Sequence, residues 1–169
     1  MYKRQEQSLG KSYFLKYPNH FNTRIIVQKT LYLLTHGLSN PKISLPYRWN
    51  FYLRGPYSSG IAHMIYHMIN FKDDVVDTPI ELEKNFKNSL NHFHEFKGEL
   101  DSIINKYKKY SKIYNADIYE LLATLIYISQ QIGSDKDKLF GKLKQFKPNL
   151  SKKLPLEDMH KILTKFKYI

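Results

Sequence analysis

The chain has 169 residues, a formal net charge of +12 and an apolar fraction of 42 %, which is typical of one folded domain. It contains no cysteine, and this excludes disulfides, a thiol nucleophile and cysteine-ligated metal centres. No apolar run reaches the roughly 20 residues of a membrane-spanning helix, and residues 1–10 lack the apolar stretch of a secretory signal. We therefore expect a single domain in the cytoplasm.

The positive charge indicates the kind of partner. Lys and Arg number 27 against 15 Asp and Glu, a balance typical of proteins that meet phosphate groups or an acidic partner. Most of these cations are lysines, whereas base-edge reading of DNA favours the planar arginine group. If nucleic acid is the partner, we expect non-specific phosphate contacts. A solvated lysine-rich surface would account for the same charge.

The first predicted element is a helix that Asn22 or Thr23 can cap. Its apolar residues recur at helical spacing up to Gly37, a typical residue just beyond a helix end. Residues 42–45 form a short candidate strand that Pro46 ends.

A second strand is predicted over residues 47–54, where apolar and polar residues alternate. The alternation places Trp49, Phe51 and Leu53 on a face toward the core. After the Gly-Pro pair that ends the strand, Ser58 or Ser59 can cap a helix. The apolar stripe of that helix consists of Ile61, Met64, Ile65, Met68 and Ile69.

The second half predicts helices only. A capping box at residues 78–81 begins one long helix that continues to Tyr107, with Gly98 as the position where it can kink. Three more helices are expected over residues 115–132, from Ser134 or Asp135 to 146, and over 155–165.

These elements predict a mainly α (α+β) protein, a single compact helical domain with a small two- or three-stranded sheet. We expect residues 22–77 to form a helix–strand–helix core and residues 78–169 to add the C-terminal helices. Residues 1–20 would be a basic, flexible tail.

One motif in the first half resembles a known family. The order of "QK-x-x-YLL", an aromatic strand, "GPYS" and a helix resembles the YwgA-like family of bacterial and archaeal proteins and, more distantly, the Panacea domain of phage-associated proteins and antitoxins. The resemblance covers residues 23–70 and implies a compact, winged-helix-like helical domain. For the Panacea group it implies toxin neutralisation by direct protein contact. The motif residues are Gln28, Lys29, Tyr32, Gly55, Pro56, Tyr57 and Ser58.

The chemistry of GPYS itself suits a structural role. Gly55 permits positive φ, Pro56 fixes the turn, and a serine satisfies the N–H groups that begin the helix. The alternative is an anion cradle at that helix N-terminus, flanked by Arg54.

Candidate metal ligands and catalytic groups are few. His63 and His67 lie four apart on one helix face, but neither His92 nor His94 completes an evident ligand set, so surface histidines are the simpler interpretation. The acidic cluster at residues 73–83 could hold Mg²⁺, although helix-start carboxylates explain it as well. We expect no metal, no cofactor and no catalytic site. His36 would act as a cation at the end of its helix.

Two functions from different classes remain. The first is a non-enzymatic protein that binds nucleic-acid phosphates, and the second is an interaction module, resembling antitoxins, that binds and neutralises an acidic protein. Both would use a basic surface with exposed aromatic rings. The candidate contact residues are Arg48, Tyr52, Arg54, Lys106, Lys108, Lys109 and Lys112.

Overall fold

A computed structural model describes residues 21–36, 47–70, 80–108 and 114–169. Within these ranges the protein is mainly helical with one small antiparallel hairpin, as the sequence predicts. The helices are α3 (Phe21–His36), α4 (Ser59–Asn70), α5 (Ile80–Lys108), α6 (Asn115–Ile132), α7 (Lys136–Phe146), α8 (Pro148–Lys153) and α9 (Leu156–Lys165). The strands are β1 (Asn50–Tyr52) and β2 (Gly55–Tyr57), paired so that Asn50 faces Tyr57.

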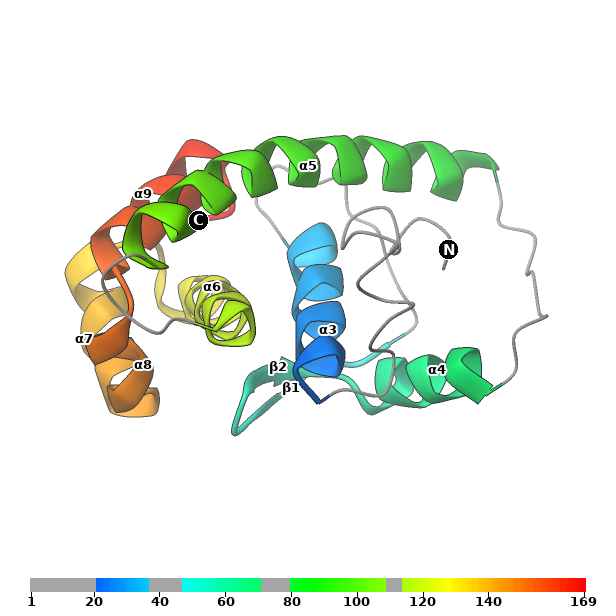
Figure 1. Ribbon diagram of the computed structural model, residues 1–169, viewed down its shortest axis with the longest axis horizontal. Helices are drawn as coiled ribbons and strands as arrows, with labels where there is room; N and C mark the ends of the chain where they lie inside the picture. Colours follow the sequence, from blue (N-terminus) through cyan, green and yellow to red (C-terminus); the bar gives the residue numbers. More distant parts are fainter. Residues whose placement is uncertain (1–20, 37–46, 71–79, 109–113) are drawn as a thin grey trace.

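Helices α3 and α6 pack against each other at the centre of the molecule. Figure 1 shows α5 running along one side of this pair and the hairpin lying on the other side. Helices α7, α8 and α9 gather at one end, beyond α6, and α4 lies at the opposite end. The hairpin contacts both central helices through β2, so its turn lies close to the start of α6.

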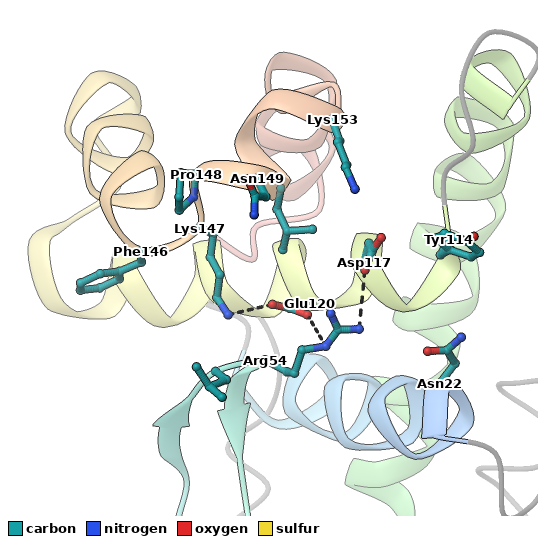
Figure 2. Close-up of a pocket in the computed structure, with 12 residues that line it drawn as sticks. Asn22, Arg54, Tyr114, Asp117, Glu120, Phe146, Lys147, Pro148, Asn149 and Lys153 are labelled. Carbon is teal, nitrogen blue, oxygen red and sulfur yellow. Dashed lines mark hydrogen bonds and ion pairs between the residues drawn. The ribbon is translucent and has the colours of Figure 1, made fainter.

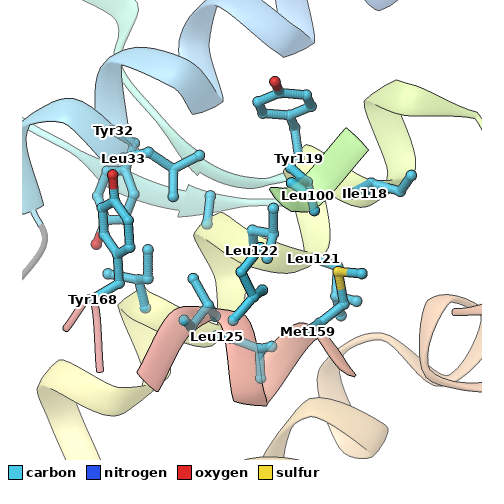
Figure 3. Close-up of a cluster of buried hydrophobic side chains, with 14 of the residues drawn as sticks. Tyr32, Leu33, Leu100, Ile118, Tyr119, Leu121, Leu122, Leu125, Met159 and Tyr168 are labelled. Carbon is cyan, nitrogen blue, oxygen red and sulfur yellow. The ribbon is translucent and has the colours of Figure 1, made fainter. Parts of the chain in front are cut away.

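The core explains why α6 is central. Its sequence is apolar on almost every face, and the helix is buried from Ala116 to Ile126 with one half-buried position, Asp117. A helix that is apolar all round must be covered on all sides. Helices α3, α7 and α9 and strand β2 contact α6, and Leu100 of α5 belongs to the same hydrophobic cluster (Figure 3). The chain end also contributes, because Tyr168 and Ile169 are buried in the same cluster.

Several predicted helices are confirmed, together with the residues at which they begin and end. Helix α6 spans the predicted residues, and α5 continues without interruption through Gly98. Helix α7 is capped by Asp135, whose carboxylate accepts a hydrogen bond from the Lys138 amide at 2.9 Å. Helix α8 is an addition to the predicted elements: Pro148 follows the end of α7 and occupies the first turn of this short helix.

The predicted strand over residues 47–54 is wrong in its length and in one of its core residues. The strand spans three residues, Asn50–Tyr52, and Leu53 is 90 % exposed at the hairpin turn. Trp49 and Phe51 are half-buried, as the alternation predicts. The error has a simple cause: the alternating pattern continues into the turn, where Leu53 has no sheet face to occupy.

Other predictions concern residues outside the described ranges. These are the basic tail at 1–20, Gly37, the strand at 42–45, the acidic residues 73–77 and the capping box at 78–79.

Candidate functional site

The QK and GPYS segments of the motif bind each other. Gln28 on α3 donates from its amide nitrogen to the Ser58 carbonyl at 2.9 Å and accepts from the Ser58 backbone N–H at 3.2 Å. The next residue, Lys29, donates from Nζ to the Pro56 carbonyl. All four residues are buried, so the motif joins α3 to β2 and to the start of α4.

The hairpin turn approaches α6 closely. Gly55 has a φ of +80°, and a Cβ at that position would lie 2.7 Å from Thr124 Oγ1, so a side chain there would be strained and crowded. Ser58 caps α4, accepting a long hydrogen bond of 3.4 Å from the Ile61 amide. The glycine thus holds the residue before it, Arg54, against α6.

Arg54 belongs to a cluster of four charged side chains, which Figure 2 shows at one wall of a pocket. Its Nε lies 2.9 Å from Oε2 of Glu120, and its Nη2 lies 3.6 Å from Oδ1 of Asp117. Lys147, at the α7–α8 junction, donates from Nζ to Oε1 of Glu120 at 2.7 Å. Glu120 is only 2 % exposed, so its charge is stabilised by the two cations rather than by water.

The same cluster influences Lys29. The pKa of Lys29 is lowered from 10.5 to about 7, mainly by burial; Glu120 opposes the shift, and Lys147 and Arg54 contribute to it. Desolvation is the largest cause because a buried ammonium loses its hydration. A neutral Lys29 still donates a hydrogen bond to Pro56.

The pocket in front of the cluster has a volume of about 530 Å³, a size that suits a ligand or several side chains of a partner. It lies between the hairpin turn, the beginnings of α3 and α6, and the α7–α8 junction. Its lining residues are Asn22, Leu53, Arg54, Tyr114, Asp117, Glu120, Phe146, Lys147, Pro148, Asn149, Leu150 and Lys153.

Exposed apolar side chains gather around this pocket. Six large apolar residues are exposed in the described part of the chain, and Leu53, Tyr114 and Phe146 line the pocket. Phe21 lies beside it, since its ring centroid is 5.9 Å from the Arg54 guanidinium carbon. We call Phe21, Leu53, Tyr114 and Phe146 the apolar rim.

The predicted contact residues that the structure describes come from two elements, the hairpin segment and α5. Arg48 is exposed, and Tyr52 is exposed beside Tyr57 with 5.3 Å between ring centroids. Arg54 is engaged by the two α6 carboxylates. Lys106 is exposed near the end of α5, a different element from the hairpin segment that carries the other three. Lys109 and Lys112 lie outside the described residues, as does the side chain of Lys108.

Tyr107 and Tyr114 have different surroundings. Helix α5 ends at Lys108, and Tyr114 precedes α6, where it is 48 % exposed. Tyr107 is half-buried and donates a hydrogen bond to Asp158. The two tyrosines therefore belong to different elements.

The predicted histidine roles need one correction. His36 is partly buried and stacks on Tyr32 with 4.1 Å between ring centroids, and burial lowers its pKa. This shift disfavours the protonated ring and so opposes the expected role as a helix-end cation. His63 is exposed and the side chain of His67 is not described. Within the described ranges, no three His, Asp or Glu residues are grouped so as to hold a metal ion.

Sequence reasoning missed Asp117, Glu120 and Lys147 as members of a site. Glu120 carried a usable signal, because it stands immediately before the apolar segment Leu121 to Ile128. A carboxylate on a helix that is buried all round requires a cationic partner. The identity of that partner could not be read from the sequence.

Comparisons do not add a family to this description. No family model, no curated protein and no solved structure matches the chain. None of the helices in the described residues is both long and apolar enough to span a membrane.

Proposed function

We propose that this protein is a non-enzymatic interaction module that docks an acidic partner protein at the pocket beside the hairpin turn. The observation that carries the proposal is the apolar rim. Exposed apolar side chains grouped around a partly polar pocket are typical of protein interfaces, where aromatic and arginine side chains supply much of the affinity. Leu53 is the clearest case, because it is almost fully exposed at a turn that the motif holds in place.

Charge supports an acidic partner. The chain carries +12, and long-range attraction accelerates encounter with a protein of opposite charge. It disfavours association of two copies, because both would bring the same positive surface. The resemblance to the Panacea domain also implies direct contact with a second protein.

Phosphate binding is the second candidate. The net charge and the exposed Arg48, Tyr52 and Lys106 favour it. Asp117 and Glu120 disfavour it at the pocket, since they pair with Arg54 and would repel the regularly spaced phosphates of a strand, whereas an acidic protein can place apolar residues beside them. The exposed rings of Phe21, Tyr114 and Phe146 could stack on bases as well as pack on a protein, so the two carboxylates are the observation that separates the candidates at this pocket.

The experiment is a pull-down from host extract with the tagged full chain and two variants, with and without nuclease. Leu53→Ser removes the most exposed rim residue. Ile132→Ser is the matched control, because Ile132 is also exposed but ends α6 away from the pocket. We expect one stoichiometric protein that survives nuclease and binds the control but not Leu53→Ser. Recovery of nucleic acid alone, or equal binding by both variants, would overturn the proposal.

A further inference from the structure

The cations that line the pocket differ in whether a carboxylate of the described residues pairs with them. Arg54 and Lys147 are paired with Glu120, and Arg54 also approaches Asp117. Lys153 extends from α8 toward the pocket (Figure 2) and has no carboxylate partner among the described residues. The ammonium of Lys153 is therefore the one lining cation that the described residues leave unbalanced.

Asn149 places an amide next to this ammonium. Asn149 and Lys153 are four residues apart on α8, so their side chains share one helix face, and both line the pocket. An ammonium and an amide on one face match the oxygens of a carboxylate, which accept hydrogen bonds from both.

A second unbalanced cation lies next to Phe146. The Nζ of Lys142 is 4.8 Å from the centroid of the Phe146 ring, and no carboxylate among the described residues pairs with it. The pocket edge thus presents a cation on α8, apolar rim residues, and another cation on α7. A segment complementary to this edge would carry acidic residues on either side of apolar ones.

From this arrangement we infer that the pocket binds a linear acidic segment of the partner protein, with one carboxylate held by Lys153 and Asn149 and apolar side chains packed on Leu53 and Phe146. This inference rests on the proposed function and specifies the partner's chemistry. Like charge disfavours a second copy of the chain. A nucleic-acid strand is disfavoured because its regularly spaced phosphates would have to pass Asp117 and Glu120, whereas a peptide can place its carboxylate at Lys153 and its apolar residues beside the cluster.

The test is selection of a random peptide display library on the immobilised full-length chain, followed by affinity measurement of the best peptide by fluorescence polarisation. The expected peptides carry Asp or Glu together with Leu or Phe. Lys153→Glu should weaken the best peptide by about tenfold or more, because it replaces attraction by repulsion. Lys161→Glu is the matched control, since Lys161 is exposed on α9 outside the pocket lining, and should change the affinity by less than about twofold.

Each other outcome has a distinct meaning. Selection of neutral or basic peptides, or an equal loss of peptide affinity in the two variants, would overturn the acidic-segment inference. The proposed function would still be tested separately by the pull-down. If no peptide is enriched, the inference that the occupant is a linear segment would be overturned, and the pull-down would again test the protein partner separately. Displacement of the peptide by a single-stranded oligonucleotide at equal concentration would favour nucleic acid at this site. Both lysines are exposed, so unchanged thermal melting should verify that the variants fold.

Discussion

The side-chain amide of Gln28 makes two hydrogen bonds with the backbone of Ser58, one to its carbonyl and one from its N–H. Both residues are buried, so no water replaces these bonds if the amide is lost. The conspicuous sequence motif therefore fixes the hairpin and α4 on α3, and it positions the turn that carries Leu53 and Arg54.

Replacing Gln28 by Ala should destabilise the fold by about 2–4 kcal/mol, because two buried backbone groups lose their partners. The measurement is the free energy of unfolding in urea. Gln131→Ala is the matched control: Gln131 is exposed on α6, and the same change there should cost less than about 0.5 kcal/mol. Equal losses in both variants would contradict the role given to Gln28.

The lowered pKa of Lys29 predicts how stability depends on pH. Between about pH 7 and the ordinary lysine value of 10.5, the unfolded chain binds more protons at this residue than the folded chain does. The free energy of unfolding should therefore rise with pH from about 7, by up to about 1.4 kcal/mol per pH unit from this group. Below about pH 7 Lys29 is protonated in both the folded and the unfolded chain, so it adds no pH dependence to the free energy of unfolding there.

Urea unfolding at pH 7, 8 and 9 checks this prediction in the wild type and in Lys29→Met. The slope should be smaller in the variant, because methionine has no proton to lose. Measurements stop at pH 9 because burial raises the pKa of Tyr32 and of Tyr119 above the usual tyrosine value, which lowers stability in more alkaline solution. Identical slopes in the two proteins would show that Lys29 titrates normally.

The charged cluster predicts a large cost for neutralising one carboxylate. Glu120→Gln should destabilise the protein by about 3–5 kcal/mol, because buried Lys147 and the guanidinium of Arg54 would lose their counter-charge. Thermal melting with calorimetry measures the loss. Glu157→Gln is the control: Glu157 pairs with Lys136 at 3.3 Å on the surface, where such pairs contribute about 0.5 kcal/mol or less. A similar cost at both positions would argue against a buried ionic cluster.

The helices were predictable because each carries a local signal. The apolar periodicity of α6, the aspartate that caps α7 and the glycine after α6 are all visible within a few residues. The proline that begins α8 is compatible with two predictions, because proline is common just after the end of one helix and also in the first turn of the next. Local pattern alone does not choose between them.

The pocket could not be predicted, because its residues come from separate elements. The sequence pattern places Glu120 on an apolar helix and Arg54 at the end of the predicted strand, but it does not say that the two meet. Their contact depends on the close approach of Gly55 to Thr124 and on the hold of Gln28 on Ser58. The exposure of Leu53 could not be predicted either. It depends on where the hairpin turns, and the alternating pattern of residues 47–54 gives no sign of a turn at Leu53.

The two glycines Gly55 and Gly98 should respond to alanine in opposite directions. Gly55→Ala places a Cβ 2.7 Å from Thr124 Oγ1 at a φ of +80° and should destabilise the fold by about 1–3 kcal/mol. Gly98 is exposed within α5 and has nothing within 4 Å of an added Cβ. There alanine should stabilise the helix by about 0.5–1 kcal/mol.

Urea unfolding of the two single variants measures both signs. Thr124→Ala in the Gly55→Ala background removes the hydroxyl that the new methyl group would meet, so it should recover part of the loss while the cost of the positive φ remains. Destabilisation by both alanines, or full recovery in the double variant, would contradict the view that the turn lies close to α6 because residue 55 is a glycine with positive φ. The turn is the part of the chain that presents Leu53 to a partner, so Gly55→Ala should also weaken binding while Gly98→Ala leaves it unchanged.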